Sequence, residues 1–302
     1  MSLTQQPATP GVAIVIVNWN TGQLLAKCLE SIQAANDHHL ISAVLVVDND
    51  SHDDSLAQAK AVATDPRIQF IAPGANLGFA GGNQAGVAVL ADSDAHILLL
   101  NPDTEIHDGT LTGMLAALND KQAGIVGAKL QNPDGTHQES VRRFPTLINF
   151  LFLWFKLRRL LPGARSWSRY MMREFDYSST QVVDQVMGAA FLVRRQVWDQ
   201  LGGLDDGFFV WFEEVDLCKR AKAAGWQTVY TPKPRVTHYG GVSFNQLVGI
   251  NRTKPWIKSS LRYIRKHTPL AWPLFLLLAP FALALALPTS LIHRSQQRLS
   301  AT

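Results

Sequence analysis

The feature that most constrains the fold is a repeated unit in which a short apolar run ends in polar residues and leads into a helix. Residues 12–17 (VAIVIV) are followed by NWNTG and then by apolar residues at helical spacing. Residues 43–48 (AVLVVD), 68–73 (IQFIAP) and 96–103 (HILLLNPD) begin similar units. Fully apolar strands that alternate with helices are typical of a parallel sheet covered on both faces. We therefore expect an α/β protein with a mostly parallel central sheet flanked by helices.

Composition permits a sizeable core and excludes several classes of protein. The chain has 302 residues, 47% hydrophobic and 17% charged, with a formal net charge of +4. This length suits one large α/β domain or two small ones. The mild excess of base suits phosphate-bearing substrates or an anionic membrane surface, and it is too diffuse to indicate nucleic acid binding. Cys28 and Cys218 lie in apolar helical patterns, which indicates buried thiols in a cytoplasmic domain.

The two ends of the chain differ in polarity. Residues 1–10 are polar and lack the basic and apolar regions of a signal peptide, so we expect a disordered N-terminus and a cytoplasmic location. Residues 270–287 (LAWPLFLLLAPFALALAL) carry no charge. As a helix they would extend about 27 Å, near the ~30 Å of a bilayer core, although two prolines would kink it. We expect an apolar helical membrane anchor, spanning or interfacial, with a buried C-terminal helix as the alternative.

The second half of the chain is less regular. Residues 124–140 suggest a strand and hairpin with a turn at residues 132–135 (NPDG). Residues 144–177 are rich in aromatic residues and arginine, which favours a basic amphipathic helix on a membrane or along an extended ligand groove. A helix packed on the core is the alternative for this segment. A strand, a helix and a strand are expected at residues 183–195, 215–225 and 226–232.

Polar side chains gather where the predicted strands end, which is where ligands bind in parallel sheets. Asp48 closes one strand, and a carboxylate there can accept hydrogen bonds from a pyrimidine or a ribose. Asn101 and Asp103 stand two apart after the most apolar strand, so both could face one Mg²⁺ or Mn²⁺ ion. Residues 76–86 (NLGFAGGNQAG) carry four glycines, which allow the backbone to approach a ligand before a helix. Plain turns are the alternative at each place.

A further cluster of acids lies within an apolar run, FFVWFEEVDLC, at residues 208–218. It contains Glu213, Glu214 and Asp216, and burial of an unpaired carboxylate costs several kcal/mol unless it is protonated. The chain must therefore supply a partner, which could be a cation, a substrate proton or a metal. His238, in RVTHYGGVS, could be a further metal ligand or a diphosphate contact; a structural histidine is the alternative.

Seven segments follow one another in order: VAIVIVNWN, VLVVDNDS, NLGFAGGNQAG, LLLNPDTEI, VMGAAFLVRR, GGLDDGFFVWFEEVDLCKRAKAAGW and THYGGVS. Together they resemble the family-2 glycosyltransferases, especially the bacterial rhamnosyltransferase-like branch, over residues 11–245. The resemblance implies the GT-A fold, a Rossmann-like fold of nucleotide-diphospho-sugar transferases. It implies a nucleotide-sugar-binding half at residues 11–130 and an acceptor-binding, catalytic half at 131–250. A basic and apolar membrane-associating tail would follow at 251–302.

The resemblance also assigns roles to residues. Glu214 takes the place of the catalytic base in the family's E-D-x-D element, where aspartate is usual. Asp103 takes the metal position of the D-x-D motif, with Asn101 in place of its first acid, and His238 would approach the metal or the diphosphate. Acceptor binding or orientation would fall to Glu213, Asp216, Gly188 and Trp211; Glu213 and Asp216 could instead cap the helix or pair with Arg194 or Arg195. The expected donor-binding residues are Asn18, Asp48, Asn49, Asp50, Asn76, Gly78, Phe79, Gly82, Asn83, Asn101 and Asp103.

The implied activity is an inverting, metal-assisted transfer of a sugar, with dTDP-L-rhamnose as the expected donor. The acceptor would be a saccharide, including one linked to polyprenyl diphosphate, in the synthesis of O-antigen-like cell-surface polysaccharide. The enzyme would work at the cytoplasmic face of the plasma membrane. The alternative is a non-catalytic nucleotide-sugar-binding component of an assembly complex. A nucleotidyltransferase is disfavoured, because NWNTG lacks the glycine-rich basic loop that those enzymes place after the first strand.

Overall fold

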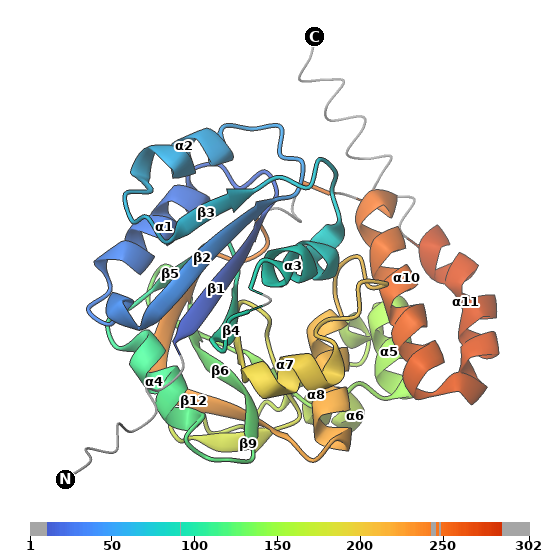
Figure 1. Ribbon diagram of the computed structural model, residues 1–302. Helices are drawn as coiled ribbons and strands as arrows, with labels where there is room; N and C mark the ends of the chain where they lie inside the picture. The colour runs from blue at the N-terminus through green and yellow to red at the C-terminus, as the bar shows by residue number, and fades with distance from the viewer. Residues whose placement is uncertain (1–10, 91, 243–245, 248, 286–302) are drawn as a thin grey trace.

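The structure is a computed structural model and describes residues 11–90, 92–242, 246–247 and 249–285. The expected disorder of residues 1–10 concerns a segment outside these residues. Within the described part, one sheet has the strand order β3-β2-β1-β4-β11-β6-β12-β5, with β7 beside β6 and β9 beside β12 (Figure 1). Its strands are β1 (Val12–Asn18), β2 (Ile41–Asp48), β3 (Ile68–Ile71), β4 (His96–Leu100), β5 (Thr104–Ile106), β6 (Ala123–Gln131), β7 (His137–Gln138), β9 (Gln181–Val183), β11 (Ala190–Val193) and β12 (Gln227–His238).

The apolar runs of the first half form parallel strands, as the sequence predicts. β1 lies between β2 and β4 and is parallel to both, and every residue of β1 is buried. Alternate residues of β1 face opposite layers, because successive side chains on a strand point to opposite sides. Val12, Ile14 and Ile16 pack in the core under α1 (Leu24–Ala34), α2 (Ser55–Val62) and α4 (Thr110–Ala117). The other face packs under α3 (Gly78–Ala88), α7 (Arg195–Leu201) and α8 (Glu213–Ala223).

The second half makes the sheet mixed rather than mostly parallel. β11 runs antiparallel between β4 and β6, and the end of β12 pairs antiparallel with β5. On its other side β12 is parallel to β6, with a register shift between Thr231 and Arg235, and it is antiparallel to β9. The expected hairpin after β6 is present, because β7 pairs antiparallel with it. The strand expected at residues 183–195 is divided, and β10 (Gln185–Val186) pairs with β8 (Val141–Arg142) in a separate small sheet.

The aromatic, basic segment at 144–177 is not one amphipathic helix. It forms α5 (Leu147–Trp154), the 3₁₀ turn η2 (Leu157–Arg159) and α6 (Arg165–Met171). Phe150, Phe152 and Trp154 of α5 are buried, so this part of the segment packs on the core.

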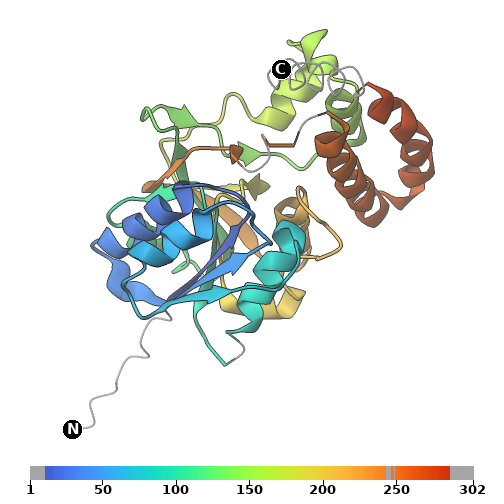
Figure 2. The ribbon, with the colours of Figure 1, turned by 90° about the horizontal axis from the view of Figure 1, so that it is seen from above.

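The C-terminal helices form a hairpin against α5. α10 (Ile250–His267) leads through η3 (Pro269–Ala271) into α11 (Trp272–Ala284), and both lie at one side of the domain (Figures 1 and 2). Phe275 of α11 packs edge-on against Phe150 and Trp154. The expected 18-residue apolar helix is not supported, because α11 has 13 residues and the end of the apolar run lies outside the described residues. Among the described helices, none combines the length and apolar character needed to cross a membrane.

Both cysteines are buried free thiols, as the sequence predicts. Burial raises the pKa of Cys28 and of Cys218 to about 12, so both are protonated at neutral pH. The two cysteine side chains therefore serve to fill space in the two core layers.

Candidate active site

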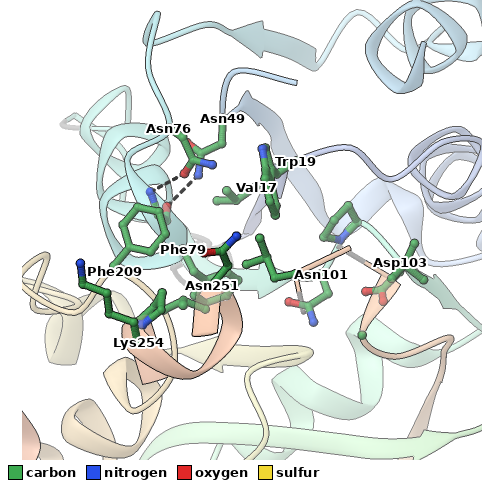
Figure 3. Close-up of a pocket in the computed structure, with 17 residues that line it drawn as sticks. Val17, Trp19, Asn49, Asn76, Phe79, Asn101, Asp103, Phe209, Asn251 and Lys254 are labelled. Atoms are coloured by element: carbon green, nitrogen blue, oxygen red, sulfur yellow. Dashed lines mark hydrogen bonds between the residues drawn. The ribbon is translucent and has the colours of Figure 1, made fainter. Parts of the chain in front are cut away.

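A cavity of about 420 Å³ opens at the carboxyl ends of β1, β2 and β4 (Figure 3). Trp19 follows β1, Asn49 follows β2, and Asn101 and Asp103 follow β4, so three neighbouring strands deliver side chains to one place. The opposite wall comes from Phe209 and Val210 and from Asn251, Lys254 and Pro255 of α10. A cavity at the ends of parallel strands is the usual ligand site of an open α/β sheet. We call it the donor pocket.

About half of the expected donor-binding residues line the donor pocket. Those that do are Asn49, Asn76, Gly78, Phe79, Asn101 and Asp103. Asn18, Asp48, Asp50, Gly82 and Asn83 do not. Asn18 is fully buried and donates hydrogen bonds to Asp48 Oδ1 at 3.0 Å and to Ser55 Oγ at 2.9 Å. Asn18 and Asp48 therefore hold together the loops after β1 and β2.

Asn49 and Asn76 fix the start of α3 beside the pocket. Asn49 Nδ2 donates to the Gly78 carbonyl at 2.8 Å, and Gly78 N donates to Asn76 Oδ1 at 2.9 Å (Figure 3). Gly78 has φ +72°, and a Cβ there would lie 2.1 Å from the Phe209 carbonyl oxygen. Phe79 N donates to that same oxygen at 2.7 Å. Only glycine permits this close approach between α3 and residue 209.

The other glycines of residues 76–86 pack a helix rather than approach a ligand. A Cβ at Gly82 would lie 2.8 Å from Val17 Cγ1, and one at Gly86 would lie 2.5 Å from Val15 Cγ1. These positions let α3 lie close to β1. Of residues 76–86, Asn76, Gly78 and Phe79 line the donor pocket, and ligand binding by the rest of the segment stays a prediction.

Asp103 and His238 come together at the edge of the donor pocket, as the metal prediction requires. His238 Nε2 lies 3.5 Å from Asp103 Oδ1 and 3.3 Å from Asn101 Nδ2. The other ring nitrogen, Nδ1, lies 2.7 Å from Gln138 Oε1, an acceptor, so Nδ1 can donate to Gln138 while Nε2 faces Asp103 and Asn101. Metal-binding histidines are usually oriented by such a hydrogen bond at the ring nitrogen that does not bind the metal.

Asp103 and His238 offer two groups of the kind that bind divalent ions. A carboxylate oxygen and an imidazole nitrogen suit Mn²⁺, and the hard oxygen also suits Mg²⁺. Within residues 11–90, 92–242, 246–247 and 249–285, no group of three His, Cys, Asp or Glu side chains gathers to hold an ion. The residues present therefore fit an ion that takes its remaining ligands from a bound diphosphate or water.

Glu213 and Glu214 begin α8 in a strongly apolar setting. Each has an Oε2 atom that is buried and has no hydrogen-bond partner in the described part of the chain. Burial raises the pKa of both carboxyls, and the charge of Glu214 raises that of Glu213 further. Trp211 and Phe212 precede them in the left-handed region, with φ 66° and 72°. Such conformations cost of order 1–3 kcal/mol each and concentrate at functional sites.

Glu214 lines a second cavity of about 180 Å³, next to Trp211, Trp256, Arg142 and Tyr170. We call it the Glu214 pocket. Gly188 lies against this side chain: a Cβ added there would be 3.7 Å from Glu214 Cβ and Cγ. The structure thus brings three predicted residues together, Gly188, Trp211 and Glu214. Glu213 is buried, with 4% of its surface exposed, and does not line this pocket.

Asp216 has a different environment and does not reach either pocket. Its side chain is fully buried and accepts hydrogen bonds from Arg220 at 2.7 Å, Lys266 at 2.9 Å and His267 at 2.8 Å. Burial opposes its ionisation, but the His267 hydrogen bond and the charge of Arg220, with further help from Lys266, outweigh burial and lower its pKa. Asp216 therefore joins α8 to α10, and its expected role in binding the acceptor is not supported.

Arg194 and Arg195, the other partners expected for Asp216, bind elsewhere. Arg195 pairs with Asp199 at 2.9 Å, and Arg194 donates to the carbonyl oxygen of Ala123, also at 2.9 Å.

Sequence reasoning missed the aromatic and α10 residues of the donor pocket. Trp19 carried a visible signal, because it stands between two asparagines directly after an apolar strand. Asn251 and Lys254 carried no such signal in the sequence, because they lie in the segment that was assigned to a membrane tail. They reach the pocket through the fold of the C-terminal helical hairpin.

The chain was compared with known proteins. The family model "Glycosyltransferase like family 2" matches residues 10–255. The chain is 31% identical over 241 residues to N-acetylglucosaminyl-diphospho-decaprenol L-rhamnosyltransferase of Mycobacterium tuberculosis, covering 76% of each chain. It is 29% identical over 265 residues to rhamnosyltransferase WbbL of Escherichia coli K12, covering 84% of this chain and 93% of WbbL.

Solved structures share the fold at low sequence identity. Mannosyltransferase PcManGT from Pyrobaculum calidifontis, in complex with GDP-Man and Mn²⁺, matches 98% of this chain and 82% of its own, with a TM-score of 0.57 and 16% identity. GalNAc-T7 with UDP, GalNAc and Mn²⁺ matches 77% of this chain and 44% of its own, with a TM-score of 0.58 and 13% identity. Together with the family match over most of its length, this likeness shows that the chain is a GT-A-fold glycosyltransferase and belongs to family 2.

Proposed function

We propose that the protein is an inverting rhamnosyltransferase that uses dTDP-L-rhamnose and acts on a saccharide linked to a polyprenyl diphosphate. The observation that carries the catalytic part is the position of Glu214 in its own pocket near the donor pocket, with its Oε2 atom buried and without a hydrogen-bond partner among the described residues. The sugar and the acceptor are argued from the relatives, whose names specify rhamnosyl transfer and, in the mycobacterial case, a diphospho-decaprenol acceptor.

In the proposed mechanism, Glu214 removes the proton from the acceptor hydroxyl as that oxygen attacks the anomeric carbon from the side opposite the diphosphate. The apolar surroundings raise the pKa of Glu214, which makes its carboxylate a stronger base. Asp103 and His238 would hold a divalent ion, Mg²⁺ or Mn²⁺, which supplies positive charge to the departing diphosphate. Lys254 lines the same pocket and adds a positive charge.

We further propose a peripheral position at the cytoplasmic face of the plasma membrane. Leu274, Leu277 and Phe281 of α11 are 57%, 71% and 66% exposed. α10, which lies beside them, carries six Lys and Arg residues and no acidic one. An apolar surface next to a cationic one is suited to an interface with anionic lipid.

The test is a transfer and hydrolysis assay of purified protein with a panel of nucleotide sugars, with and without Mn²⁺. We expect turnover with dTDP-L-rhamnose, and a rate at least ~100-fold lower in Glu214→Gln, with donor binding unchanged. Glu213→Gln is the matched control and should keep most of the rate, since Glu213 does not line the pocket. Turnover with none of the donors would refute the proposed function, and an unaffected Glu214→Gln enzyme would refute the assigned base.

A further inference from the structure

A third cavity, of about 410 Å³, adjoins the Glu214 pocket and has no role in the mechanism above. The two cavities share Leu153, Trp211 and Trp256 in their linings, so they are neighbours across a common wall. Lys156, which follows α5, and Arg252, on α10, bring two cations to this third cavity. We call it the Lys156–Arg252 pocket.

The charge of this pocket is unbalanced. No carboxylate lines it, and neither Lys156 nor Arg252 forms an ion pair with any residue the structure describes. Both residues are exposed, so each remains available to a ligand. Two cations opposite aromatic walls suit an anion with several oxygen acceptors, such as a diphosphate.

The apolar surface of α11 begins at the same pocket. Ala282 contributes to its lining, and the neighbouring Phe281 and Leu285 are 66% and 46% exposed. A ligand with a diphosphate at Lys156 and Arg252 could therefore continue as a hydrocarbon chain along α11 in one direction and toward Glu214 in the other. An inorganic or nucleoside diphosphate would leave the apolar surface unused.

We propose that the Lys156–Arg252 pocket binds the diphosphate of a lipid-borne acceptor, with the lipid chain on α11 and the saccharide directed to the Glu214 pocket. The placement of the saccharide rests on the proposed function, whereas the diphosphate site rests on the pocket itself. Lys156 and Arg252 would thereby set the distance between the membrane surface and the hydroxyl that reacts.

The test measures binding of farnesyl diphosphate by tryptophan fluorescence, because Trp154, Trp211 and Trp256 line the pocket. The full-length Lys156→Gln/Arg252→Gln protein should bind this probe at least ~10-fold more weakly than the unmodified protein, as expected for the loss of charge-assisted hydrogen bonds. Arg158→Gln/Lys258→Gln is the matched control. It removes the same charge from the same two segments at exposed positions outside the pocket, and its affinity should stay within about 2-fold.

Two further ligands separate the possible sources of the signal. Inorganic pyrophosphate should bind more weakly than farnesyl diphosphate, and farnesol should bind more weakly still. Equal affinity for pyrophosphate would overturn the lipid assignment, equal affinity for farnesol would overturn the diphosphate assignment, and an unchanged affinity in the Lys156→Gln/Arg252→Gln protein would overturn the site.

The result is independent of turnover. If the protein binds farnesyl diphosphate through these cations but transfers no sugar, the diphosphate site stands and the proposed function is refuted. If it transfers sugar but the two double variants bind farnesyl diphosphate equally well, the proposed function stands and the diphosphate site is refuted.

Discussion

At the scale of residues, the carboxylates that begin α8 differ because, among the described residues, only Asp216 forms ion pairs. Asp216 is surrounded by Arg220, Lys266 and His267, whereas Glu213 and Glu214 each have a buried oxygen without a partner in the described chain. The pKa is lowered in the first case and raised in the other two. Their contributions to stability therefore depend on pH in opposite directions.

Glu213→Gln should stabilise the protein more at pH 8 than at pH 5. Burial and the charge of Glu214 raise the pKa of Glu213, so between its unfolded and folded pKa values the folded state binds more protons than the unfolded state. Stability contributed by this group therefore falls as pH rises above the ordinary glutamate value of 4.5, and glutamine removes that loss. Urea unfolding of both proteins at the two pH values measures the difference. A constant difference would show that Glu213 is not perturbed.

Asp216→Asn should lower the free energy of unfolding by about 3 kcal/mol at neutral pH, the low end for a broken buried ion pair, because Lys266 keeps Asp205 as a second partner. The pKa of Asp216 is lowered, so its stabilisation is present above the ordinary value of 3.8 and is lost as pH falls through the folded pKa. Chemical denaturation measures both. Asp199→Asn, which breaks the exposed pair with Arg195, should cost under about 0.5 kcal/mol.

The sequence could identify site residues that lie close to one another along the chain. Asn101 and Asp103 were predicted together from their spacing of two, and both line the donor pocket, although a turn at residues 102–103 rather than an extended segment places them there. The burial of Asn18 could not be found, since its partners Asp48 and Ser55 lie 30 and 37 residues away. The cations around Asp216 were missed for the same reason: Lys266 and His267 are 50 and 51 residues distant.

At the scale of elements, α3 is held to β1 by small residues. Gly86→Ala should lower the free energy of unfolding by about 1–3 kcal/mol, because its Cβ would meet Val15 Cγ1 at 2.5 Å and the overlap exceeds the gain in helix propensity. Thermal and urea unfolding measure the loss. Gly163→Ala is the control, since a Cβ there meets nothing within 4 Å, and its stability should change by less than about 1 kcal/mol. Equal stability of the two variants would contradict the packing of α3.

Helices and strands were predictable where the hydrophobic pattern of the sequence is compatible with only one type of element. Apolar runs bounded by polar turns gave β1, β2, β3 and β4 near their observed positions. Hydropathy alone cannot distinguish a membrane helix from one packed on a protein core, and α11 uses Phe275, Ala279 and Ala282 for such packing. The position of α10 over the donor pocket follows from that packing and from Asp216, so it was not visible in the sequence.

At the scale of the whole molecule, the helical hairpin gives the protein one apolar side. Leu277→Ser/Phe281→Ser should reduce binding to liposomes that contain anionic lipid by at least ~10-fold, because each exposed side chain would contribute about 1.5–3 kcal/mol when buried in lipid. Flotation of liposomes with bound protein measures this. Val89→Ser/Val182→Ser changes side chains that are 52% and 60% exposed on α3's C-terminal side and on β9, and it should float as the unmodified protein does. Identical flotation of both variants would exclude α11 as the contact.

The backbone between residues 209 and 212 separates the donor pocket from the Glu214 pocket. Phe209 and Val210 line the first, and Trp211 lines the second. Phe209 and Trp211 stand two residues apart on this short segment, so we expect a ligand that displaces Phe209 to shift Trp211 as well. The consequence is thermodynamic linkage between the two substrates: whatever factor the nucleotide sugar applies to acceptor affinity, the acceptor must apply in return.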